Sequence, residues 1–120
     1  MREILFRGKR VDNGEWVYGL ICRVGDKYAN IVEKSTEVMC TVLTNTIGQF
    51  TGLTDKNGKK IFEGDIVVIN TSEKRKIKKY RVEFDNSIFG IRLSTNANDN
   101  TIIPLRSFDY IEIIKGEEND

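Results

Sequence analysis

Apolar residues in this chain recur mostly at every second position or in short runs, and no stretch shows a convincing helical period. Tyr80, Val82 and Phe84 alternate with polar neighbours, which is typical of a half-buried strand. The run Ile66–Ile69 is continuously apolar and suits a strand covered on both faces. The pattern predicts an all-β fold with at most one or two short helical turns, at Ile61–Glu63 or Leu105–Ser107.

Turn signals divide these runs into hairpins. Asp12-Asn13-Gly14 precedes a strand that begins at Trp16, and in Asp55–Gly58 the glycine is expected to supply a positive φ. Gly64-Asp65 before an apolar run is similar to the start of a strand in small SH3-like barrels. We therefore expect small β-barrel-like units built from hairpins, with a structural motif of Gly52, Asp55, Gly58, Gly64 and Asp65.

The length of 120 residues suits one compact chain with two β units. We expect an N-terminal unit over residues 1–45 and a C-terminal unit over 46–116, packed with it. Residues 117–120 are expected to form a frayed acidic tail.

Composition weighs against common forms of catalysis. The chain has no histidine, which removes Ser-His and Cys-His pairs and any zinc site that needs an imidazole. Its two cysteines, Cys22 and Cys40, lie in apolar strand-like contexts and are expected to be buried free thiols. We predict no catalytic, cofactor-binding or metal-binding residues, and no cofactor.

The net charge of +1 conceals a strongly basic segment at residues 74–81. Six of its eight residues are basic and none is acidic: Lys74, Arg75, Lys76, Lys78, Lys79 and Arg81. Such a run could contact nucleic acid, and Arg7, Lys9 and Arg10 form a second, smaller basic group near the N-terminus. The alternative is a solvated loop, or a lysine-rich segment that protects a sheet edge.

Two further groups of side chains allow more than one interpretation. Trp16 and Tyr18 lie two apart on one predicted strand face, so both belong to the core or both line a groove, and the core is favoured. Glu63 and Asp65 could hold Mg²⁺ in a metal-dependent hydrolase, although any acidic pair at the start of a strand would have this spacing.

The N-terminus lacks an apolar run long enough for a signal peptide, and no segment approaches the length of a membrane span. We expect a soluble cytoplasmic protein with no membrane partner.

The segment Ile47–Val67 is highly distinctive and resembles the signature of the YopX family, proteins encoded by phages and prophages. The opening Arg2–Gly8, the stretch Gly14–Gly19 and the later Val82–Asn86 are also similar to that family. The C-terminal stretch Phe108–Ile114 departs from it. The resemblance implies a phage protein with a mostly β fold, oligomeric assembly and no catalytic residues to carry over.

The function expected from the sequence is that of a non-catalytic phage accessory protein, a β-rich binding or assembly module that works through protein contacts. Its expected partners are further copies of the chain, or a phage or host protein. The alternative is a nucleic-acid-binding accessory protein that uses residues 74–81. A metal-dependent carboxylate hydrolase is a third possibility.

Overall fold

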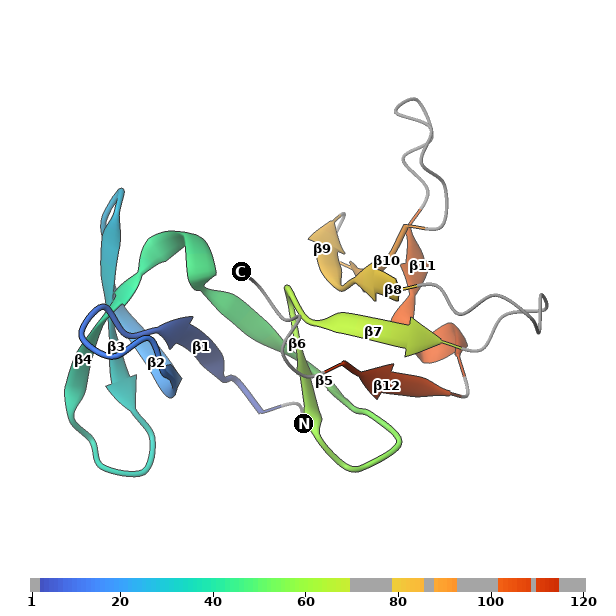
Figure 1. Ribbon diagram of the computed structural model, residues 1–120, viewed down its shortest axis with the longest axis horizontal. Helices are drawn as coiled ribbons and strands as arrows, with labels where there is room; N and C mark the ends of the chain where they lie inside the picture. The colour runs from blue at the N-terminus through green and yellow to red at the C-terminus, as the bar shows by residue number, and fades with distance from the viewer. Residues whose placement is uncertain (1–2, 70–78, 86–87, 93–101, 109, 115–120) are drawn as a thin grey trace. The chain divides into compact units, whose positions relative to one another are not determined.

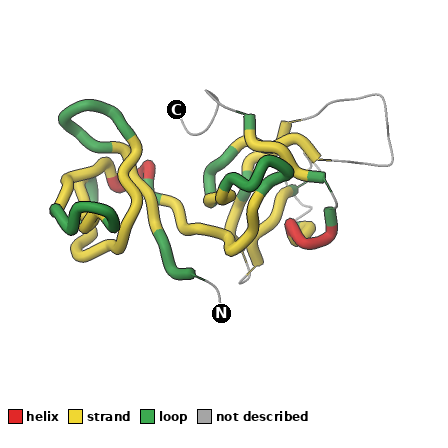
Figure 2. Tube along the Cα trace, turned by 90° about the horizontal axis from the view of Figure 1, so that it is seen from below, coloured by secondary structure: helices red, strands yellow, loops and turns green. Residues whose placement is uncertain are grey.

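The computed structural model describes residues 3–69, 79–85, 88–92, 102–108 and 110–114. The chain falls into two compact units, Met1–Phe50 (unit 1) and Thr51–Asp120 (unit 2), which we describe one at a time. Strands dominate both units, and the helical pieces among the described residues are two short 3₁₀ turns, η1 (Thr44–Thr46) and η2 (Leu105–Ser107) (Figures 1 and 2). The all-β prediction is confirmed.

Unit 1 is an antiparallel sheet with the strand order β4-β3-β2-β1 and the first residues of β5 paired to β1. Its strands are β1 (Phe6–Lys9), β2 (Trp16–Val24), β3 (Tyr28–Glu33), β4 (Met39–Leu43) and the start of β5 (Gly48–Thr54). The turn at Asn13 and Gly14 connects β1 to β2, and the Asn13 side chain accepts a hydrogen bond from the Glu15 amide at 2.9 Å. Buried side chains on one face of the sheet form its core, namely Val17, Ala29, Ile31, Cys40 and Val42.

Unit 2 contains the rest of β5 with β6 (Lys60–Phe62) and two three-stranded antiparallel sheets. One sheet has the order β12-β7-β8, and the other has the order β11-β10-β9. Their strands are β7 (Ile66–Ile69), β8 (Lys79–Arg81), β9 (Glu83–Asp85), β10 (Ile88–Ile91), β11 (Ile103–Pro104) and β12 (Ile111–Ile113). The core includes Ile61, Val67, Val82, Ile91 and Leu105, each at most 1% exposed.

Two details differ from the sequence-based expectation. The antiparallel sheets of the described residues are not closed into a barrel; an isolated bridge pairs Arg10 with Val42, but no continuous ladder follows it. The segment Lys60–Phe62 is strand β6 rather than a helical turn, because Ile61 and Phe62 are buried and the Ile61 carbonyl accepts a hydrogen bond from Thr51 Oγ1 at 2.8 Å. The predicted turn at Leu105–Ser107 is present as η2.

Candidate binding surface on unit 1

Strand β2 has large apolar side chains on both faces. Val17 is 1% exposed and contributes to the core, whereas its neighbours Tyr18 and Leu20 are 40% and 56% exposed. Trp16 lies on the same face as Tyr18 and is half-buried. The core assignment of Trp16 and Tyr18 is therefore wrong: the core side of β2 is taken by Val17, and these aromatic rings lie on the opposite face.

Cationic side chains of β1 pack on this outer aromatic face. Arg7 is paired in register with Tyr18 and Lys9 with Trp16, so all four side chains lie on one side of the sheet. The Arg7 guanidinium carbon lies 4.2 Å and the Lys9 Nζ 5.3 Å from the centroid of the Trp16 ring. Such cation–π contacts stabilise the ring orientation and keep positive charge against the sheet.

Arg10, the third member of this small basic group, forms a separate ion pair. Its Nη2 lies 2.7 Å from Asp12 Oδ2, at the turn that leads into β2. The hydrogen bond from the guanidinium holds the pKa of Asp12 below its ordinary value, and the carboxylate raises the pKa of Arg10. Asp12 is exposed and Arg10 is partly exposed, so solvent screens the pair and it contributes little to stability.

An apolar row crosses three strands on the same outer face. Leu20 of β2 is opposite Val32 of β3, which is opposite Met39 of β4. Leu20 and Met39 are 56% and 60% exposed, and Ile4, just before β1, is 66% exposed. Because directly opposed residues in antiparallel strands share a face, Leu20, Val32 and Met39 form one apolar row. Ile4 lines the same pocket as Leu20 and Val32.

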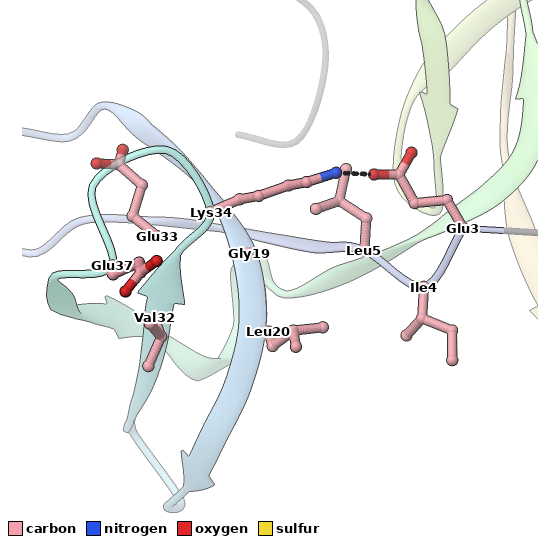
Figure 3. Close-up of a pocket in the computed structure, with 9 residues that line it drawn as sticks. All are labelled: Glu3, Ile4, Leu5, Gly19, Leu20, Val32, Glu33, Lys34 and Glu37. Carbon is pink, nitrogen blue, oxygen red and sulfur yellow. Dashed lines mark hydrogen bonds and ion pairs between the residues drawn. The ribbon is translucent and has the colours of Figure 1, made fainter.

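A pocket of about 310 Å³ opens on this surface. Its apolar lining comes from Ile4, Leu5, Leu20 and Val32, and the backbone of Gly19 contributes to its wall (Figure 3). The volume is at the lower end of the range of small-molecule pockets. It suits one or two aliphatic side chains better than a large cofactor.

Charged residues also line the pocket. Three of them are glutamates, Glu3, Glu33 and Glu37, and the fourth is Lys34. Figure 3 shows Lys34 extending to Glu3, with which it forms an ion pair, while Glu33 and Glu37 lie at the turn between β3 and β4. The pocket therefore combines an apolar lining with a net negative charge.

The β3–β4 turn is held by hydrogen bonds to the Glu33 carboxylate and to the Glu33 carbonyl. Thr36 Oγ1 donates a hydrogen bond of 2.7 Å to Glu33 Oε1, and the Glu37 amide donates one of 2.8 Å to the Glu33 carbonyl. Glu37 has a backbone φ of +61°, a left-handed conformation that residues other than glycine, asparagine and aspartate rarely adopt.

In the signature segment of unit 2, Asp55 organises a turn. Its Oδ1 accepts hydrogen bonds from the amides of Asn57 and Lys59, both at 2.9 Å, and its Oδ2 accepts one from Ile113 at 3.1 Å. Gly58 in the same turn has φ of +82°. Asp55 thus ties the β5–β6 connection to the C-terminal strand β12.

Gly64 and Asp65 have a similar role before β7. Asp65 is 1% exposed, and its Oδ2 accepts a hydrogen bond of 2.8 Å from the Phe62 amide. The Asp65 carbonyl accepts another, also of 2.8 Å, from Val82. Gly64 and Gly52 have φ of +93° and +89°, so the predicted motif residues support backbone geometry in unit 2.

The basic segment is described only in part. Four of its predicted contact residues, Lys74, Arg75, Lys76 and Lys78, lie outside the described residues. Lys79 and Arg81 are exposed on β8, and Tyr80 between them packs against the unit 2 core.

The two thiols differ in exposure. Cys40 is buried, as expected, but Cys22 is exposed. The expectation for Cys22 is wrong because the register of β2 against β3 shifts between Ile21 and Arg23, where Cys22 lies.

Glu63 and Asp65 do not form a recognisable metal site. Asp65 is buried and bonded to a backbone amide, whereas Glu63 is half-buried. Within the described ranges, no group of three or more histidine, cysteine, aspartate or glutamate side chains could hold a metal ion.

No helix among the residues that the structure describes has the length and apolar character needed to cross a bilayer.

These features define a small all-β protein with an acidic-rimmed apolar pocket on one sheet. The family model described as YopX protein matches residues 5–114, so the chain belongs to the YopX family. The family assignment made from the signature Ile47–Val67 is confirmed.

A solved structure gives a second comparison. The crystal structure of protein EF1440 from Enterococcus faecalis is similar to this chain, with a TM-score of 0.52 and 20% sequence identity. The match covers 95% of this chain and 92% of the other, and it shows likeness of fold. The comparison with curated proteins gave no match.

Proposed function

We propose that this chain is a non-catalytic accessory protein of phage or prophage origin that acts in the bacterial cytoplasm. In this proposal it binds through protein contacts, and its partner is a further copy of itself. The outer face of the unit 1 sheet is the contact surface.

The observation that carries the proposal is the exposed apolar row around the pocket. Leu20, Met39 and Ile4 are each more than half exposed. Contiguous exposed apolar surface next to charged side chains is typical of protein–protein interaction sites. Covering this row on association would remove its unfavourable contact with water.

The chemistry of the signature segment supports a non-catalytic role. The carboxylates of Asp55 and Asp65 are buried and accept hydrogen bonds from backbone amides. Groups bound in this way stabilise loops and are poorly placed to transfer protons to a substrate. The absence of histidine from the sequence removes the commonest acid–base group at neutral pH.

A second candidate function is binding to nucleic acid. The observation that favours it is the exposure of Lys79 and Arg81 on β8, next to the basic residues 74–78 in the sequence. Such binding would weaken steeply as salt is added, because each neutralised phosphate releases counterions. Fluorescence anisotropy of a labelled single strand at low and high salt distinguishes this candidate from a protein-binding role.

The primary test is the substitution Leu20→Asp in the full chain. We expect it to weaken self-association by at least about tenfold, because a carboxylate would enter an apolar contact surface. The matched control is Val24→Asp, at a 59% exposed residue of the same strand that does not line the pocket. Size-exclusion chromatography with light scattering measures the mass. Equal association of both variants and the wild type would contradict the proposed surface.

A further inference from the structure

We infer that the unit 1 pocket binds the basic segment 74–78 of a second copy of this chain. This inference rests on the proposed function, since it names the group that enters the contact surface. It predicts a contact between two different surfaces, an acidic pocket on one copy and a basic segment on the next.

The electrostatics of the pocket select a positively charged occupant. Lys34, the cation among the described lining residues, already forms an ion pair with Glu3. Glu33 and Glu37 add two further carboxylates at the turn between β3 and β4. A ligand with positive charge would balance them, whereas an acidic ligand would be repelled.

The apolar lining requires an aliphatic side chain in the same ligand. Leu20 and Val32 are opposed in register and present branched side chains to the pocket. A ligand that carried charge alone would leave this apolar surface in contact with water. The occupant therefore combines an aliphatic residue with basic neighbours.

Residues 74–78 combine an aliphatic residue with several basic residues in one short segment. Residues 74–78 read Lys-Arg-Lys-Ile-Lys, with the aliphatic Ile77 between two lysines and no acidic residue. Ile77 matches the apolar lining of the pocket, and the flanking lysines match Glu33 and Glu37. Charge complementarity of this kind directs association and fixes which surfaces meet.

The geometry of such a contact has a consequence for assembly. A pocket on one copy that binds a segment of the next is a head-to-tail contact, which builds a ring if it closes and a longer chain if it does not. Masses above that of a dimer are therefore expected as concentration rises.

The test exchanges the charges of the two surfaces in full-length chains. One variant carries Glu33→Lys with Glu37→Lys, and the other carries Lys76→Glu with Lys78→Glu. Each variant alone is expected to associate at least about tenfold more weakly than the wild type, since like charges then face each other. An equimolar mixture is expected to recover the assembly, because each reversed surface then meets its complement.

A control separates this contact from a general effect of charge. The pair Glu15→Lys with Asp26→Lys makes the same change in net charge at exposed residues of unit 1 that do not line the pocket. It is expected to associate like the wild type. Circular dichroism of every variant confirms that it is folded.

A second variant keeps the inference testable if the charge reversals unfold the chain. Glu37→Gly removes one carboxylate and relieves the left-handed backbone at φ of +61°. It is expected to melt no lower than the wild type and yet to associate several-fold more weakly. Unchanged association of Glu37→Gly would count against the inference.

Several outcomes overturn the inference and leave the proposed function standing. If Leu20→Asp abolishes association but Lys76→Glu with Lys78→Glu does not, the pocket is a contact surface with another occupant. If the mixture fails to recover the assembly, the two surfaces do not meet. If the lysine variant loses only retention on a labelled single strand, the segment serves nucleic acid. A wild-type chain that never associates would overturn the inference and the proposed function together.

Discussion

Replacing Asp65 by alanine is expected to lower the free energy of unfolding by about 3 kcal/mol. The carboxylate is 1% exposed and accepts a hydrogen bond from the Phe62 amide, so the alanine variant leaves that buried donor without its acceptor. Urea denaturation followed by circular dichroism measures the loss. Asp65→Asn, which keeps a carbonyl oxygen of similar size, should lose less.

A matched control uses a carboxylate of the same type in a different setting. Asp26 is exposed in the turn between β2 and β3, and Asp26→Ala should change the unfolding midpoint very little. The sole tryptophan, Trp16, lies in unit 1, so its fluorescence follows that unit while circular dichroism follows the strands of both. Equal stabilities for Asp65→Ala and Asp26→Ala would refute the structural role assigned to Asp65.

Replacing Gly19 by alanine is expected to destabilise unit 1 by about 3 kcal/mol. A methyl group at this position would collide with the carbonyl oxygen of Val32, where β3 passes close to β2. Because the obstacle is backbone, relief requires movement of one strand and disturbs the pairing that positions Leu20 against Val32. Trp16 fluorescence during denaturation reports the effect.

The control for Gly19 is a glycine that has space around it. Gly14 has φ of +72°, and a methyl group there would meet no heavy atom within 4 Å. Gly14→Ala should therefore cost only the conformational penalty, about 1 kcal/mol. If Gly19→Ala were the milder substitution, the close approach of β2 and β3 would not be the constraint we describe.

Much of the fold could be predicted because its signals are local. Turn residues such as Asn13, Gly14 and Gly58 occur between strands. The alternation of Tyr80, Val82 and Phe84 is confirmed at Val82, which is 1% exposed, but it is wrong for Phe84, which is 47% exposed because the chain changes strand at Val82. The residue pattern of the signature segment predicts the family, and the hydrogen bonds that Asp55 and Asp65 accept from backbone amides give part of that pattern a structural role. Local chemistry of this kind can be read from spacing alone.

The candidate surface could not be predicted because it depends on which face of a strand is covered. In β2 the set Trp16, Tyr18 and Leu20 is as apolar as the set on the core side, so alternation does not say which one is buried. Only the pairing of β2 with β3, and of β3 with β4, shows that Leu20, Val32 and Met39 form one row on the outer face. The large apolar residues on both faces of β2 were the available signal.

The pocket charges were missed for a related reason. Glu3 is thirty residues from Glu33 in the sequence, and Glu33 and Glu37 lie among other polar residues. The three glutamates line one pocket only because the end of β3 lies beside the segment before β1. Likewise, barrel closure was expected from the Gly64-Asp65 motif, but such a motif specifies the start of one strand and not the pairing of the sheet edges. Register decides both features, and register is set by contacts that are distant in sequence.

Sedimentation equilibrium of the wild-type chain over a range of protein and salt concentrations tests the proposed self-association directly. Self-association through an apolar surface with a charged rim predicts an average mass that rises above 13.8 kDa with concentration. Added salt should weaken that association, since it screens the exposed charges around the pocket. A mass of 13.8 kDa, that of a single chain, at every protein and salt concentration would contradict self-association.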